Sequence, residues 1–194
     1  MRPQYSITSQ PCGEPLTIAQ ASEHLRVDSV DDMSYIDGLI SVAREYVDSV
    51  TGRVSGVTSF RLIAESWESI AQSAWCIPVY RTPLISVASI KYYAPDASAL
   101  TTMNSANYRV ITAAEPGLIQ IIDDVPAVDD RPDAIEILFS AGTDNASPVH
   151  RHAVKMLVAH LYENRLPIAF ASCNQIPMTL QTLIENIKLG GWIG

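Results

Sequence analysis

The 194-residue sequence lacks the features that mark membrane and exported proteins. No apolar run approaches the roughly 20 residues of a membrane-spanning helix, and the first residues, MRPQYSITSQPCGEP, have no apolar signal core. Its three cysteines, Cys12, Cys76 and Cys173, are odd in number, widely spaced and free of any CxxC pattern. We therefore expect a soluble globular chain made in a cytoplasm, with reduced structural thiols and no membrane contact.

Basic residues are also scarce. Lys and Arg number 13 against 21 Asp and Glu, for a formal net charge of −8. Nucleic-acid binding through the whole surface is therefore excluded, because phosphate contacts need clustered basic residues. Counted by segment, the net charge is −5 over residues 1–52, −5 over 53–146 and +2 over 147–194. Two interpretations remain open, namely charges scattered over a solvated surface or head-to-tail complementarity between copies.

Catalytic sequence motifs are missing. The chain has no phosphate loop, dinucleotide fingerprint, nucleophile elbow or zinc-protease motif. Of the four histidines, His24 stands alone, and His150, His152 and His160 lie on one predicted helix. His152 and His160 are roughly 12 Å apart along that helix, too far for one metal ion. We therefore predict no catalytic, cofactor-binding or metal-binding residues, and no cofactor.

Three pairs of adjacent carboxylates resemble acid–base pairs, but neighbours in sequence point in different directions. The pairs are Asp31 with Asp32, Asp123 with Asp124, and Asp129 with Asp130. A capping role is available to the first pair, and the other two lie beside proline in predicted turns, where Asp stabilises the backbone. All three are therefore expected to be structural.

The aromatic residues give no clear ligand site. Lys91 with Tyr92 and Tyr93 resembles a base-stacking platform, but a single Lys in an acidic section does not favour nucleic acid. The tryptophans are as well explained as core or interface anchors as ligand platforms, and they are Trp67, Trp75 and Trp192. An enzyme site assembled from distant residues is the least favoured alternative, and its candidates are His160, Glu163 and Asp144.

The longest helical pattern covers residues 31–52. Its apolar residues recur every three or four positions and are expected to face a core: Ile36, Ile40, Ala43, Val47 and Val50. The opposite, solvated face is expected to hold Asp37, Arg44, Glu45 and Asp48. Asp31 or Asp32 is predicted to cap the start, and Gly52 suits the left-handed residue that ends a helix.

Two further helices are predicted over residues 17–26 and 148–166. Thr17 and Gln20 have the spacing of a capping box, and the short link to residue 31 favours a helical hairpin. Ser147 is the expected N-cap of the later helix, with Pro148 at its first position. An amphipathic pattern near the C-terminus predicts one more short helix.

Between residues 54 and 146 the pattern is that of β-strands, rich in β-branched and aromatic residues and broken by turn residues. The predicted strands, arranged as an antiparallel meander, are Thr58–Ala64, Ala74–Val79, Ser86–Tyr93, Tyr108–Thr112, Leu118–Ile122 and Ala134–Ser140.

These elements together predict an α+β fold. We expect a helical bundle, made of the N-terminal hairpin and the long C-terminal helix, with an inserted antiparallel β-rich section over 54–146. Residues 1–15 are predicted to be a flexible arm, 16–166 a single domain, and 167–194 a C-terminal helix and docking tail.

The order of several motifs resembles a known family. The segments are LTIAQASEHLRVD, DDMSYIDGLISVAREYVDSVTGR, a β-rich middle with YRV and EPGLI, and VKMLVAHLYENR. In this order, over about residues 16–188, they are similar to the phage head–tail connector (adaptor) family, the gp6-like or gp15-like proteins, in the branch with a β-rich insertion between the helices.

The resemblance implies a non-enzymatic structural protein of the virion, located at the head–tail interface. It implies a ring of about twelve copies beneath the portal protein that extends the DNA channel, without sequence-specific DNA binding, and contacts a stopper or tail protein. A tail-completion protein or another virion interaction module, binding through the β section, is the alternative.

Overall fold

The computed structural model describes residues 3–9, 11, 13–164 and 178–190. The chain divides into two compact units, each assembled from two separate segments. The β unit comprises residues 1–12 and 57–143, and the helical unit comprises 13–56 and 144–194.

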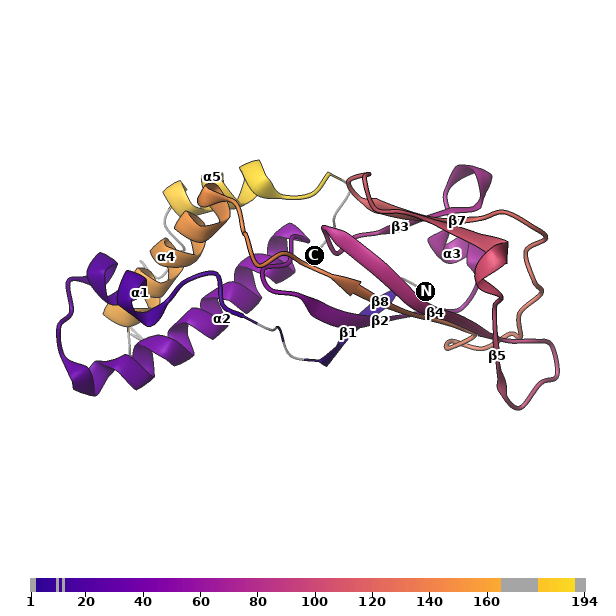
Figure 1. The fold of residues 1–194 in the computed structure, drawn as a ribbon, viewed down its shortest axis with the longest axis horizontal. Helices are drawn as coiled ribbons and strands as arrows, with labels where there is room; N and C mark the ends of the chain where they lie inside the picture. Colours follow the sequence, from indigo (N-terminus) through magenta and orange to yellow (C-terminus); the bar gives the residue numbers. More distant parts are fainter. Residues whose placement is uncertain (1–2, 10, 12, 165–177, 191–194) are drawn as a thin grey trace. The chain divides into compact units, whose positions relative to one another are not determined.

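The helical unit is built around its longest helix. The helices are α1 (Ile18–Leu25), α2 (Met33–Thr51), α4 (Pro148–Glu163) and α5 (Met178–Ile187), with the 3-10 turn η1 (Val30–Asp32) leading into α2. In Figure 1, α2 and α4 run side by side, and α2 also contacts α1 and α5. The predicted core face of α2 is confirmed for Ile36, Ile40, Ala43 and Val47, which are fully buried.

Most predicted helix ends are confirmed. The Thr17 hydroxyl accepts a hydrogen bond from Gln20 N at 3.2 Å, and Gln20 Oε1 accepts one from Thr17 N at 3.1 Å. Gly52 is left-handed, with φ 75°, and Ser147 caps α4. The predicted cap of α2 is wrong, since no side chain caps its first turn. Asp32 Oδ2 instead accepts from the Tyr162 hydroxyl at 2.8 Å.

The predicted solvated face of α2 is partly wrong. Arg44 and Asp48 are buried, with 7% and 8% of their surface exposed. Arg44 Nε donates to Glu14 Oε2 at 2.8 Å, so its charge is compensated. A helix with three helical neighbours buries more than one apolar stripe, and polar residues at the edge of that stripe then need partners of their own.

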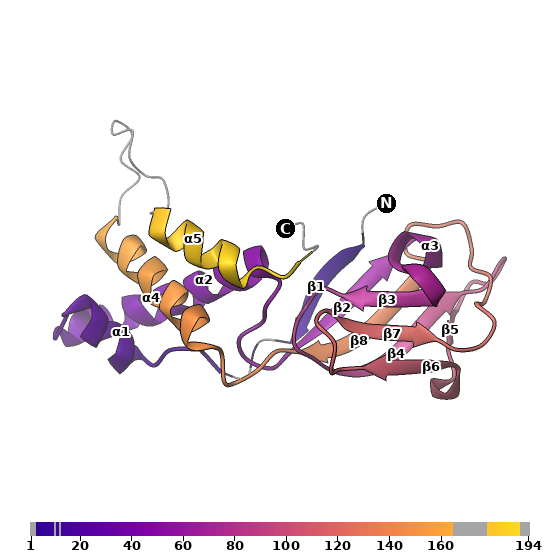
Figure 2. The ribbon, with the colours of Figure 1, turned by 90° about the horizontal axis from the view of Figure 1, so that it is seen from above.

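The β unit contains two antiparallel sheets (Figure 2). One has the order β1-β2-β8-β4-β5, from β1 (Gln4–Ser9), β2 (Thr58–Ala64), β8 (Ile135–Ala141), β4 (Leu84–Tyr93) and β5 (Leu100–Thr102). The other has the order β3-β7-β6, from β3 (Cys76–Val79), β7 (Gly117–Ile121) and β6 (Tyr108–Ile111). A short helix, α3 (Trp67–Ile70), and the 3-10 turns η2 (Ser73–Trp75) and η3 (Ser105–Asn107) connect strands.

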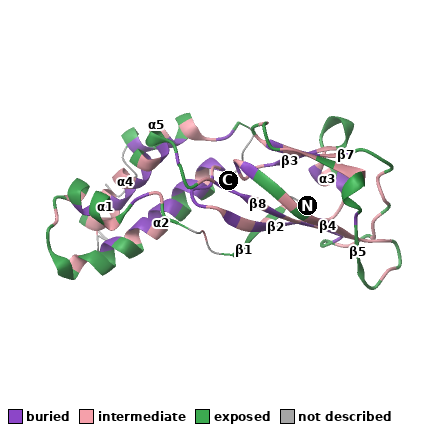
Figure 3. Ribbon diagram, viewed as in Figure 1, coloured by how far each residue is buried: buried purple, intermediate pink, exposed green. Residues whose placement is uncertain are grey.

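The β-unit core lies on the facing sides of these sheets. Buried and partly exposed residues alternate along β2 and β8, so each strand turns one face to the core (Figure 3). Phe60 and Phe139 stack there with ring centroids 5.5 Å apart. Gly117 of β7 lies so close to Leu84 of β4 that a Cβ at position 117 would be 2.5 Å from the Leu84 Cβ.

The predicted fold class is wrong. The chain is a β-rich mixed α/β protein with two antiparallel sheets, and not a helical bundle carrying an inserted section. The meander is also wrong, because β8 lies between β2 and β4, and β3 pairs with β7 in a separate sheet. Such pairings join distant residues, whereas alternation in a sequence reports only on a strand's own two faces.

Both ends of the chain contribute elements to these units. Residues 4–9, within the segment expected to be a flexible arm, form β1 and pair with β2. Near the C-terminus, α5 buries Leu180 and Ile184 in the helical core, so most of its apolar stripe is used inside the unit. The rest of the predicted tail, residues 167–177 and 191–194, lies outside the described residues. Within the described ranges, no helix is both long and apolar enough to cross a membrane.

Candidate functional site

A buried polar cluster joins the last turn of α2 to the first turn of α4. Asp48 accepts from the Ser55 hydroxyl at 2.8 Å and from Ser55 N at 3.0 Å. His150 Nε2 lies 3.0 Å from Asp48 Oδ1 and 3.3 Å from Ser55 Oγ. Ser55 and His150 are only 1% and 3% exposed.

The composition of this cluster resembles a catalytic triad, but its geometry does not. In a triad the imidazole lies between acid and nucleophile and uses a different ring nitrogen for each. Here Asp48 and Ser55 both face Nε2 of His150, and the Ser55 hydroxyl donates to the carboxylate. The near-complete burial of Ser55 also excludes a substrate. The cluster therefore holds the connector after α2 against α4.

Sequence reasoning missed this cluster. It placed Asp48 on a solvated face of its helix and expected no functional role for His150. Helical periodicity cannot reveal the cluster, because Ser55 lies beyond the end of α2 and His150 is 102 residues after Asp48. Polar residues on the flank of a buried stripe are the only signal that the sequence offers.

A polar pocket of about 320 Å³ opens between the start of α1 and the first two turns of α4. It is lined by Leu16, Gln20, Pro148, Arg151, His152 and Lys155. Within the described part of the chain, neither Arg151 nor Lys155 forms an ion pair. The pocket is therefore a site of positive charge on a chain that is acidic overall, and we call it the α1/α4 pocket.

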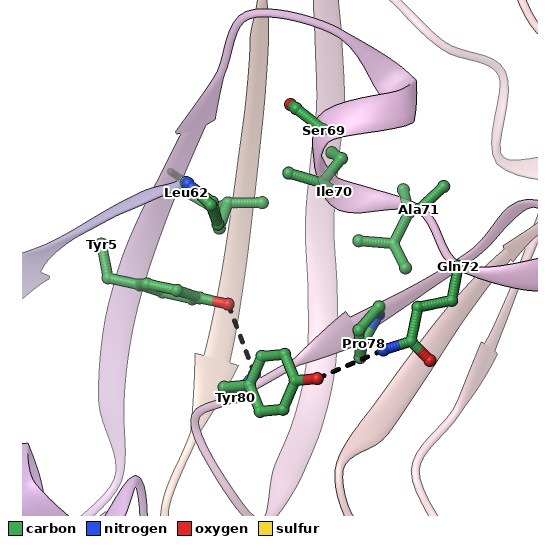
Figure 4. Close-up of a pocket in the computed structure, with 10 residues that line it drawn as sticks. Tyr5, Leu62, Ser69, Ile70, Ala71, Gln72, Pro78 and Tyr80 are labelled. Carbon is green, nitrogen blue, oxygen red and sulfur yellow. Dashed lines mark hydrogen bonds between the residues drawn. The ribbon is translucent and has the colours of Figure 1, made fainter. Parts of the chain in front are cut away.

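The β unit has a pocket of about 230 Å³ beside its edge strand β1 (Figure 4). The Tyr5 hydroxyl accepts from Tyr80 N at 3.3 Å, and Gln72 Nε2 donates to the Tyr80 hydroxyl at 3.3 Å. Burial raises the pKa of Tyr5 to about 12, although the Tyr80 N–H and the Arg81 guanidinium act in the opposite direction. The neutral phenol therefore serves as a hydrogen-bond acceptor that helps to hold β1 in place.

The remaining histidines do not gather into a site. The ring of His24 lies 6.5 Å from that of His152, in an edge-on arrangement. No group of three potential metal ligands occurs among the described residues. Asp144 precedes α4, whereas His160 is near its C-terminal end, about 18 Å along the axis from Pro148. The least favoured enzyme hypothesis therefore finds no assembled site.

The other sequence candidates have structural contacts in the β unit. Trp67 Nε1 donates to Pro126 O at 2.8 Å from a buried position. Arg131 lies 3.7 Å from the ring centroid of Tyr93, and Lys91 lies 3.9 Å from Glu136. Asp129 Oδ1 accepts from the backbone of the residue after it, as expected of a turn. Trp192 lies outside the described residues.

Comparison with known proteins relates the chain to solved structures only. No protein-family model matches it, and no curated protein matches it in sequence. A chain in the neck of an empty gene transfer agent (GTA) particle, computed with C6 symmetry, is similar with a TM-score of 0.75, 20% identity and 98% of both chains covered. A chain in the virion of a native GTA particle is similar with a TM-score of 0.73 and 20% identity, and the match covers 98% of this chain and 97% of that one. A chain in the neck of a native GTA particle, computed with C12 symmetry, is similar with a TM-score of 0.65 and 18% identity, and the match covers 98% of both chains. At these identities the likeness concerns the fold.

Proposed function

We propose that this chain is a structural protein of the head–tail neck of a phage or phage-like particle. In this role it acts as an adaptor, with a ring of about twelve copies beneath the portal that extends the DNA channel and joins the capsid to the stopper or tail. It works without a cofactor, and its place is the virion, after synthesis in the bacterial host.

The observation that carries the proposal is the extent of the fold likeness. It covers 98% of the chain, including both units, and 98% of the GTA neck chain with a TM-score of 0.75. Likeness confined to a small sheet or a helical hairpin would suggest no function, because such pieces recur in unrelated proteins. The ordered sequence motifs that resemble the connector family support the proposal independently.

The surface of the helical unit fits a subunit of an assembly. Its exposed large apolar residues include Val30, Met33, Tyr35, Val42, Tyr46 and Val149. Three of these, Tyr35, Val42 and Tyr46, follow one flank of α2 at intervals of seven and four residues, on a single helix face. A neighbouring subunit would cover such a flank. The net charge of −8 would let DNA pass through a channel without being retained.

Native mass spectrometry of the purified chain, alone and with portal protein, tests the proposal. The expected result is a monomer at low concentration and a ring of about a dozen copies at high concentration or on the portal. A stable dimer that forms no ring and does not bind portal would contradict it. Pull-downs against portal and tail-tube proteins distinguish the adaptor from a tail-completion protein, which would prefer the tube.

A further inference from the structure

An acidic projection lies at one end of the helical unit. The connector between α1 and α2, residues 28–31, presents Val30 with 76% of its surface exposed, between the exposed Asp28 and Asp31. Within the described part of the chain, neither carboxylate forms an ion pair or a side-chain hydrogen bond. Arg26, two residues earlier, is the one basic residue beside them in sequence. An apolar side chain is therefore held out in water between two uncompensated negative charges.

The α1/α4 pocket of the same unit carries the complementary features. The apolar lining of the α1/α4 pocket comes from the exposed Pro148 and from Leu16, which is 4% exposed, and Arg151 and Lys155 supply positive charge. Its volume of about 320 Å³ exceeds that of one valine side chain, leaving room for a flanking carboxylate. Both cations are partly exposed and so remain available to a partner.

Within the described part of one copy the two features do not pair, since neither Asp28 nor Asp31 forms an ion pair with Arg151 or Lys155. The connector follows the last residue of α1, and near that end the ring of His24 lies 6.5 Å from the ring of His152 in the pocket. The neighbouring Asp32 bonds Tyr162, which lies about 20 Å from Pro148 and about 10 Å from Lys155 along α4. In Figure 1 this indigo connector lies at the end of the helical unit where α2 begins. A contact between two different surfaces of neighbouring copies is a head-to-tail contact, which generates a ring when the rotation closes.

We propose that the acidic connector 28–31 of one copy inserts into the α1/α4 pocket of the next. Val30 occupies the apolar part, and Asp28 and Asp31 pair with Arg151 and Lys155. This inference rests on the proposed ring function and names the residues that join its subunits. It also gives a structural basis to the charge difference between residues 1–52 and 147–194.

Charge reversal on each side, and on both together, tests the contact. One variant carries Arg151→Glu and Lys155→Glu, a second carries Asp28→Lys and Asp31→Lys, and a third carries all four changes. The control, Asp123→Lys with Asp124→Lys, makes the same charge change as the second variant on an exposed loop of the β unit. Assembly is followed by light scattering and native mass spectrometry over a concentration series, with and without portal protein, at low and high salt.

At low salt, each two-site variant should need about tenfold more protein than wild type for half-maximal assembly. This difference between variant and wild type should shrink as the salt concentration rises. The four-site variant should recover assembly, because the charges are exchanged rather than lost, and the control should behave as wild type. If wild type assembles and the two-site variants assemble equally well, this contact is wrong and the neck function stands. Loss in both two-site variants without recovery in the four-site variant also contradicts the contact. If wild type forms no ring and does not bind portal, the neck function fails and this inference fails with it.

Discussion

Ile40 of α2 and Leu157 of α4 belong to one buried cluster in the helical unit, with 1% and 5% of their surface exposed. Replacing either by Ala should lower the free energy of unfolding by about 2–5 kcal/mol, because it removes buried methyl groups and leaves a cavity. Urea denaturation gives the value. Val42→Ala is the matched control on α2, since Val42 is 54% exposed, and it should change stability by less than about 0.5 kcal/mol. Equal effects at positions 40 and 42 would contradict the assigned faces.

Gly117 is required where β7 passes close to β4. Gly117→Ala would place a Cβ 2.5 Å from the Leu84 Cβ, which is near the backbone and cannot rotate away. We expect a loss of about 1–3 kcal/mol, as for overpacked cores, measured by thermal or urea unfolding. Gly38→Ala in α2 meets no atom within 4 Å and should instead stabilise by roughly 0.5–1 kcal/mol. A stabilising Gly117→Ala would show that the sheets are further apart than described.

Tyr5 makes the stability of the β unit depend on pH in the alkaline range. Its pKa is about 12 in the folded chain against 10.0 for an ordinary tyrosine, so the unfolded chain releases this proton first as pH rises. The contribution of the neutral phenol is complete below pH 10 and is lost as pH approaches about 12. Between those values, wild type should lose up to about 2 kcal/mol more than Tyr5→Phe in urea titrations. Parallel curves for the two proteins would contradict the burial of Tyr5.

Single residues were predictable from the sequence where one helix face decides their surroundings. Ile36 and Ile40 follow the helical period, and the Thr17 capping box is a local pattern with a local cause. Arg44 and Asp48 were not predictable, because their partners come from other segments. A charged residue on the flank of a helix has the same sequence pattern whether water or Glu14 compensates it.

At the scale of elements, Asp48, Ser55 and His150 connect α2, its following connector and α4. Asp48→Ala removes the acceptor of the Ser55 hydroxyl and of Ser55 N, and it should cost about 1–3 kcal/mol, as for a buried donor left without its acceptor. Chemical denaturation measures the loss. Asp37→Ala is the control, an exposed carboxylate on the same helix, and should be nearly neutral. A nearly neutral Asp48→Ala would mean that the cluster does not hold these elements together.

Strands were predictable where one face is buried and not where the strand lies at an edge. β2 matches its predicted range, Thr58–Ala64, because its buried residues alternate strictly. β1 and β5 were missed, since nearly every residue in them is exposed and no alternation marks them. The order of strands was not predictable either, because β8 reaches β2 and β4 from far along the chain.

At the scale of the molecule, the error in fold class has a single cause. Residues 13–56 and 144–194 together form the helical unit. The residues between them, 57–143, pack with residues 1–12 into a second compact unit that has its own core. Because the longest helix dominates the sequence pattern, the β section was predicted to be an insertion, although it forms a compact unit of its own with residues 1–12. The candidate contact between copies was predictable only as a charge difference, because the pocket appears once α1 and α4 are packed together.

We propose that the chain forms a ring in the neck of a phage-like particle. Cryo-electron microscopy of the chain bound to its portal protein tests this most directly. We expect a closed ring of about twelve copies on the portal, with residues 28–31 of each copy against Arg151 and Lys155 of the next. A portal without such density, in the presence of excess chain that remains monomeric or dimeric, would contradict it.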